Sequence, residues 1–133
     1  MEYRIFGTER MSEVLEFFGE AGWRAYLGDD DKLKRALENS PYLLGAFEGE
    51  ALVGFIRCVG DGEHIVYVQD LIVRKADRRK GIGRELMRRA MEKYARVRMF
   101  TLITDAGDET ANAFYRSLGM KAYESGGMAG YYR

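Results

Sequence analysis

The sequence predicts an α/β fold: a mixed, mostly antiparallel sheet of six to seven strands with helices on both faces. Three observations carry this prediction. Short apolar, strand-like runs alternate with amphipathic helical patterns along the 133 residues. Glycine-containing turns join three consecutive strand-like runs, which favours an antiparallel meander. A later stretch reads strand, charged turn, helix and strand, which is the pattern of a right-handed βαβ crossover.

Length and composition favour one domain spanning residues 1–133, large enough for a single hydrophobic core. Lys+Arg and Asp+Glu balance at 21 each, so the overall charge gives no attraction to nucleic acid or anionic membranes. The lone Cys58 excludes an intramolecular disulfide and fits a reducing compartment. No apolar run approaches the roughly 20 residues of a membrane span, and Met1–Arg4 does not resemble a signal peptide. We therefore expect a cytoplasmic protein.

The first third of the chain is expected to form one strand and two helices. Tyr3–Phe6 has the composition of a short strand. A helix follows, because apolar residues recur at i, i+3, i+4 and i+7: Met11, Val14, Leu15 and Phe18. The second helix begins at Asp29–Asp31, whose acidic side chains favour the positive end of a helix, and it ends before Pro41.

The middle of the chain is expected to form the antiparallel meander. Its three strands are Tyr42–Glu48, Ala51–Val59 and His64–Val73. The turns between them contain Gly49 and the Gly60–Gly62 segment, residues that suit tight reversals of the chain.

The last third is expected to complete the crossover and close the sheet. The apolar stripe of a long helix runs from Ile82 to Tyr94, and Arg98–Thr104 forms the next strand. Asp108 caps a further helix. Met120–Glu124 and Met128–Tyr132 then form a final hairpin.

The charged turn before the long helix is the strongest functional signal. It reads Arg78-Arg79-Lys80-Gly81-Ile82-Gly83 and is followed by Arg84. Glycines without a Cβ let backbone N–H groups approach a bound group, and the helix presents its unpaired N–H groups and positive dipole end there. The basic side chains add charge-assisted hydrogen bonds. The turn is therefore expected to hold a phosphate or pyrophosphate.

Of three phosphate-binding motifs, one fits. A Walker loop needs Lys-Ser or Lys-Thr after its second glycine, and a dinucleotide fingerprint needs a third glycine where Leu86 stands. The stretch Arg78–Gly83 matches Q/R-x-x-G-x-G/A, the coenzyme A pyrophosphate loop of the GNAT N-acetyltransferase superfamily. Gln69–Val73 resembles the fourth strand of that superfamily, and Asn112–Met120 resembles its N-x-F-Y-x-x-x-G-F segment. The chain thus resembles the small, single-domain, bacterial-type members.

The resemblance implies that acetyl-CoA is the cofactor and that its acetyl group passes by direct attack to a primary amine of a small molecule or peptide. It implies that the cofactor is bound by the turn, by the strand before it and by the later segment: Leu71, Ile72, Val73, Arg78, Arg79, Lys80, Gly81, Ile82, Gly83, Arg84, Asn112 and Tyr115. A backbone N–H of Leu71 or Ile72 would face the thioester oxygen. Tyr115 would protonate the leaving thiolate, and Asn112 would bind the pantetheine arm or hold the start of its helix.

The general base and the acceptor pocket are less specific in the sequence. Asp70 is the first choice for the base, and a structural carboxylate is an equally good interpretation. Gln69 cannot act as a base but can orient an amine or a water molecule. The aromatic residues Trp23, Tyr26 and Tyr67 would line the acceptor pocket with Gln69, although core packing is the commoner role of such residues.

Two alternatives stay open at this point. The absence of an unambiguous base also suits a coenzyme A-binding sensor or partner module without transfer activity. A basic-loop nucleic-acid binder is the other, and the balanced charge argues against it. We expect no metal site, no nucleic-acid or membrane partner, and a monomer or homodimer.

Overall fold

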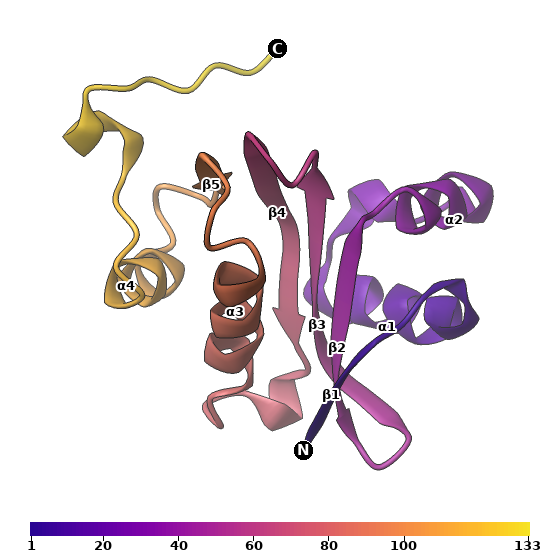
Figure 1. Ribbon diagram of the computed structural model, residues 1–133. Helices are drawn as coiled ribbons and strands as arrows, with labels where there is room; N and C mark the ends of the chain where they lie inside the picture. The colour runs from indigo at the N-terminus through magenta and orange to yellow at the C-terminus, as the bar shows by residue number, and fades with distance from the viewer. The chain divides into compact units, whose positions relative to one another are not determined.

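The computed structural model describes residues 1–133 and contains a five-stranded sheet in the order β1-β2-β3-β4-β5 (Figure 1). The first four strands pair antiparallel, and β4 and β5 pair parallel. The strands are β1 (Glu2–Ile5), β2 (Tyr42–Glu48), β3 (Ala51–Gly60), β4 (Ile65–Val73) and β5 (Met99–Thr101).

The chain forms two compact units, residues 1–102 and residues 103–133. The first holds the sheet and three helices: α1 (Met11–Ala21), α2 (Asp30–Glu38) and α3 (Ile82–Lys93). The second holds α4 (Glu109–Ser117). None of the helices combines the length and apolar character needed to cross a bilayer. One acetyltransferase domain spanning residues 1–133 stays a prediction.

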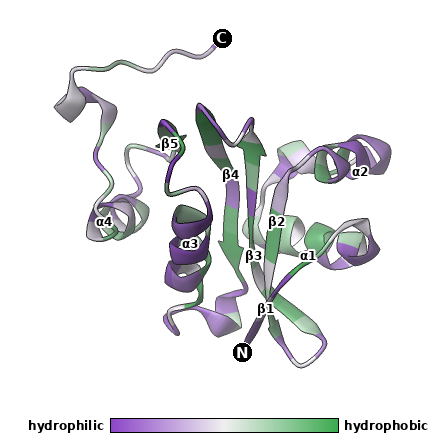
Figure 2. Ribbon diagram, in the orientation of Figure 1, coloured by the Kyte–Doolittle hydropathy of each residue, from purple (hydrophilic) through white to green (hydrophobic).

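Helices cover both faces of the sheet in the first unit, with α1 and α2 on one face and α3 on the other (Figure 1). The side chains buried on the α1 and α2 face form one apolar core: Phe6, Val14, Phe17, Phe18, Leu33, Leu37, Leu43, Phe47, Leu52, Phe55 and Ile72. On the other face α3 buries Ile82, Leu86, Met87 and Ala90. In Figure 2 hydrophobic residues lie along the strands, whereas α2 and α3 are largely hydrophilic. The predicted fold class is confirmed.

Two of the helices begin at a capping aspartate. The Asp29 carboxylate accepts a hydrogen bond from Lys32 N at 3.1 Å, and that of Asp108 accepts one from Ala111 N at 3.0 Å. Each cap satisfies an N–H group that the first turn of a helix leaves unpaired. The predicted cap at Asp108 is therefore confirmed.

A β-bulge interrupts the pairing of β3 with β4. Arg57 lies opposite Asp70, whereas the next residue of β3, Cys58, lies opposite Val68, so Gln69 has no partner on β3. The extra residue shifts the alternation of side chains along β4. As a result Tyr67 and Asp70, three residues apart, project from the same face of the sheet.

The end of the chain differs from the prediction. The sheet has five strands rather than six to seven, because the expected hairpin of Met120–Glu124 and Met128–Tyr132 is absent. A 3₁₀ turn spans Tyr123–Gly126, and residues 127–133 have no regular structure. The physical reason lies in the Glu-Ser-Gly-Gly sequence, in which Ser125 Oγ donates to Ala122 O at 2.8 Å and Gly127 takes a φ of 74°. These local bonds favour a helical turn over a two-stranded ribbon, which is only marginally stable by itself.

Candidate functional site

The turn between β4 and α3 is built from left-handed backbone conformations. Gly81, at the N-cap of α3, has a φ of 80°, and Arg79 is the one non-glycine residue with positive φ, at 65°. Glycine adopts this conformation without strain, whereas a non-glycine residue such as Arg79 does so at a cost in energy, and such residues often occur at ligand-binding turns. Lys75 N donates to Glu20 on α1 at 2.9 Å, so the start of the turn is fixed to the body of the unit.

The N-terminus of α3 has no capping side chain, in contrast to those of α2 and α4. The helical ladder starts with Glu85 N, which donates to Gly81 O at 3.0 Å, so the N–H groups of Ile82 and Gly83 precede it. Gly83 is not among the residues with positive φ, and the backbone therefore does not require glycine there. A helix end with small residues and no cap is suited to an external anion.

Two basic side chains of the turn interact with other residues of the same segment. Arg78 Nε donates to Val73 O at 3.2 Å, and Lys80 Nζ pairs with Asp77 Oδ1 at 3.2 Å. Arg79 and Arg84 are exposed. The turn thus presents positive charge beside the N–H groups of α3, as the sequence predicts.

One edge of β4 is open along its second half. β5 pairs only with Ile65–Tyr67, and Figure 1 shows it beside the first part of β4. Arg74 N donates to Val53 O on β3 at 2.9 Å. Because main-chain groups alternate between the two edges of an antiparallel strand, those of Ile72 also turn toward β3.

The main-chain groups of Leu71 and Val73 therefore turn toward the open edge. The bond that Val73 O accepts from Arg78 agrees with this direction. An extended ligand can pair with these groups as an added strand would. Of the two N–H groups named for the thioester oxygen, that of Leu71 has the suitable direction.

A buried polar cluster lies at the bulge. Arg57 Nε pairs with Asp70 Oδ2 at 2.6 Å, and the Tyr26 hydroxyl donates to Asp70 Oδ1 at 2.6 Å. Tyr26 Oη accepts from Arg57 Nη2 at 3.2 Å and from Gln69 Nε2 at 2.8 Å, and Arg57 Nη1 donates to Ser40 Oγ at 3.2 Å. Asp70 is only 2% exposed. Both of its carboxylate oxygens are occupied, which fits the structural role that the sequence left open beside that of base.

The aromatic residues named for the acceptor pocket lie in the turn between α1 and α2 and on β4. The ring of Tyr26 stacks on Phe18 with centroids 4.2 Å apart, and Trp23 stacks on Phe18 at 5.7 Å. Burial, and then the hydrogen bond to Asp70, raise the pKa of Tyr26. The structure therefore brings together Tyr26, Gln69 and Asp70, with Trp23 packed beside them.

Sequence reasoning missed Arg57 and Ser40 as members of this cluster. Arg57 is the one charged residue in the otherwise apolar strand β3, and it is only 4% exposed. A lone charge in such a strand indicates a buried partner, so this signal was available.

The second unit carries Asn112 and Tyr115 on α4. Asn112 Nδ2 donates to Asp105 O at 2.9 Å and to Asp108 O at 2.7 Å, which is the role of holding the start of the helix. Tyr115 packs against Phe114 with ring centroids 5.2 Å apart. Burial, and then the Asp108 carboxylate, raise the pKa of Tyr115, so its hydroxyl keeps its proton at neutral pH.

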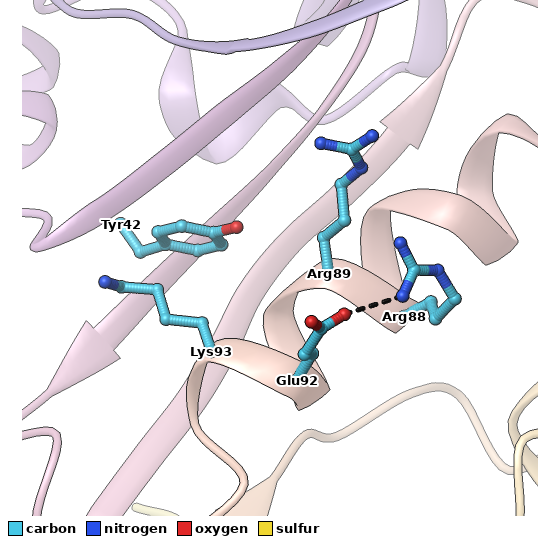
Figure 3. Close-up of a pocket in the computed structure, with 5 residues that line it drawn as sticks. All are labelled: Tyr42, Arg88, Arg89, Glu92 and Lys93. Atoms are coloured by element: carbon cyan, nitrogen blue, oxygen red, sulfur yellow. Dashed lines mark hydrogen bonds and ion pairs between the residues drawn. The ribbon is translucent and has the colours of Figure 1, made fainter.

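A separate open hollow of about 460 Å³ lies between α3 and β2 (Figure 3). It is lined by Tyr42, Arg88, Arg89, Glu92 and Lys93. These side chains pair with one another, since Arg88 Nη1 lies 2.6 Å from Glu92 and Lys93 Nζ lies 5.5 Å from the centre of the Tyr42 ring. The hollow includes none of the predicted site residues.

The N-terminus of α3, which has no capping side chain, leads to a first prediction. Gly83→Glu should raise the free energy of unfolding without ligand by about 1 kcal/mol, because glycine is a poor helix former and an acidic side chain favours the positive helix end. Ser12→Glu is the matched control, since Ser12 is exposed and also second in its helix. Urea unfolding measures both variants. A loss of stability confined to Gly83→Glu would show that the fold itself requires this glycine.

Comparisons with known proteins give matches over most of the chain. The family model described as Acetyltransferase (GNAT) family matches residues 8–120. A GNAT-family acetyltransferase from Streptococcus pneumoniae shares 33% identity over 99% of this chain and 94% of that chain, with a TM-score of 0.83. The PaiA N-acetyltransferase of Thermoplasma acidophilum, solved with coenzyme A, shares 20% identity over 90% of this chain and 89% of that chain, with a TM-score of 0.75.

No curated protein matches the chain. The family model nevertheless covers most of its length, and the streptococcal relative aligns with nearly all of it. The resemblance found in the sequence is thereby confirmed: this chain belongs to the GNAT family of acetyltransferases, which use acetyl-CoA as the acetyl donor.

Proposed function

We propose that this chain transfers the acetyl group of acetyl-CoA to a primary amine of a small molecule or peptide, by direct attack of the amine on the thioester. The observation that carries the proposal is the uncapped N-terminus of α3 directly after the open edge of β4. A surface that can bind an anion and a strand edge that can pair with an extended chain thus lie close together in the sequence, which matches a ligand with a pyrophosphate and a long amide-containing arm.

The residues of the first unit would bind and orient the donor. The N–H groups of Ile82 and Gly83 would bind the pyrophosphate, with Arg79 and Arg84 adding charge. The main chain of Leu71 and Val73 would pair with the pantetheine arm. The N–H of Leu71 would stabilise the negative charge that develops on the thioester oxygen.

Acetyl-CoA would supply the activated acetyl group as a thioester. As the new N–C bond forms and the C–S bond breaks, the Tyr115 hydroxyl would give its proton to the leaving sulfur and would then take a proton back from solvent water. With both oxygens of Asp70 occupied, we assign the proton of the amine to solvent water and give Asp70 a positioning role through Tyr26. Trp23, Tyr26, Tyr67 and Gln69 would form the wall of the acceptor site.

A panel of amines tests the proposed function. The chain is incubated with acetyl-CoA and each amine, free thiol is followed over time, and mass spectrometry identifies the product. We expect thiol release that depends on a primary amine, together with an N-acetyl product. Thiol release that does not depend on any amine would contradict the proposal.

The occupied carboxylate of Asp70 favours one second candidate, a coenzyme A-binding module without transfer activity. The same panel separates the two functions. Tight binding of acetyl-CoA with no product from any amine is the result that this candidate predicts.

A further inference from the structure

The polar cluster at the bulge has a fixed direction of hydrogen bonding. The Asp70 carboxylate can only accept hydrogen bonds, and the Arg57 guanidinium can only donate them. The Tyr26 hydroxyl lies 2.6 Å from Asp70 Oδ1, so its single proton points to that oxygen. Burial and Asp70 both raise the pKa of Tyr26, which keeps this proton in place.

The direction of these hydrogen bonds also determines the orientation of the Gln69 side-chain amide. With its proton directed at Asp70, Tyr26 Oη can only accept from its other neighbours, Arg57 Nη2 at 3.2 Å and Gln69 at 2.8 Å. Gln69 must therefore turn its NH₂ group toward Tyr26 and its carbonyl oxygen Oε1 away from it. The NH₂ group and the carbonyl oxygen of an amide are similar in size and shape, and here the buried ion pair, acting through Tyr26, decides which of them faces the hydroxyl.

Gln69 also stands at a special place on β4. It is the bulged residue, without a partner on β3, and its side chain is exposed. It precedes Leu71, whose N–H turns toward the open edge, by two residues, or about 6–7 Å along a strand. A hydrogen-bond acceptor of fixed orientation thus stands two residues before the proposed thioester site on the same strand.

We propose that Gln69 Oε1 accepts a hydrogen bond from the attacking amine and that Gln69 determines the acceptor class. This inference rests on the proposed function. A primary amine carries two N–H groups: one proton leaves to water as the N–C bond forms, and the other stays on the nitrogen, hydrogen-bonded to Gln69 Oε1, and remains in the amide product. A secondary amine or an alcohol has a single hydrogen to lose and leaves Oε1 unpaired. Tyr26, Asp70 and Arg57 act as positioning residues through Gln69.

The test compares Gln69→Met, which keeps the length of the side chain but removes its acceptor, with the control Ile65→Met at another exposed position of β4. For Gln69→Met we expect kcat/KM for the best primary amine to fall about tenfold, the typical effect of one lost hydrogen bond. The dissociation constant of acetyl-CoA should change less than about twofold. Ile65→Met should leave both quantities unchanged.

A double-mutant cycle tests the positioning role. Tyr26→Phe keeps the ring on Phe18 but releases the amide of Gln69, so KM for the amine should rise while the affinity for acetyl-CoA stays the same. In the Tyr26→Phe background, Gln69→Met should cost much less than it does alone, since the residues act in series.

Each outcome decides one claim. Full activity of Gln69→Met toward primary amines, or full additivity of the two substitutions, would overturn the inference while leaving the proposed function intact. An unsubstituted chain that acetylates no amine would overturn the proposed function and this inference with it.

Discussion

Arg57→Met should lower the free energy of unfolding by about 3–5 kcal/mol, the usual cost of leaving one charge of a buried ion pair without its partner. Arg57 is 4% and Asp70 2% exposed, so water cannot replace the lost guanidinium. The substitution also removes donors to Tyr26 and Ser40. Urea unfolding at neutral pH measures the change.

The double variant Arg57→Met with Asp70→Asn is the control for this prediction. It removes both charges while keeping an oxygen that can accept from Tyr26, so it should recover a large part of the lost stability. Loss of less than about 1 kcal/mol in Arg57→Met would mean that the pair is as solvated as an exposed one.

Tyr115→Phe should lower kcat by about 10²-fold or more, in the range expected for loss of a general acid. Burial, and then the Asp108 carboxylate, raise the pKa of Tyr115 above its usual value, so the hydroxyl is protonated and can give its proton to a thiolate throughout the neutral range. The dissociation constant of acetyl-CoA should stay within about threefold, because one hydroxyl is a small part of so large a ligand. Steady-state rates and calorimetric titration measure the two quantities.

Tyr131→Phe is the matched control, since Tyr131 lies in the same unit and is 94% exposed. It should change neither rate nor affinity. An unaltered kcat for Tyr115→Phe between pH 6 and pH 10 would remove Tyr115 from the proposed mechanism.

The sequence is most informative where one short stretch determines the structure. The apolar periodicity of α1 and α3, the cap at Asp108 and the glycine turn each depend on residues close together in the chain. Their positions could therefore be predicted without knowledge of the sheet. The family motif around Gly81 and Gly83 belongs to the same class, because the groups proposed to bind the cofactor are the backbone N–H groups of one helix end.

The polar cluster could not be predicted in the same way. Arg57 meets Asp70 only because of the register of β3 and β4, and the bulge at Gln69 sets that register. Gln69 and Asp70 are neighbours that a regular strand would send to opposite faces, yet both contact the hydroxyl of Tyr26. Asp70 and Gln69 could therefore be predicted as site residues from the sequence, but their shared contact with the Tyr26 hydroxyl could not. The hairpin predicted at the end of the chain failed for a local reason. Ser125 and Gly127 form their hydrogen bonds within the 3₁₀ turn and not with a neighbouring strand.

The most direct test of the central claim is thermal unfolding with acetyl-CoA, comparing the unsubstituted chain with Gly83→Glu and Ser12→Glu. At about 100 times its dissociation constant, a ligand that binds the native state stabilises it by roughly 2.7 kcal/mol. We predict such a rise for the unsubstituted chain and for Ser12→Glu, and none for Gly83→Glu, whose carboxylate would stand where the pyrophosphate binds. An equal rise in all three would contradict the cofactor site at the start of α3, and no rise in any of them would contradict cofactor binding itself.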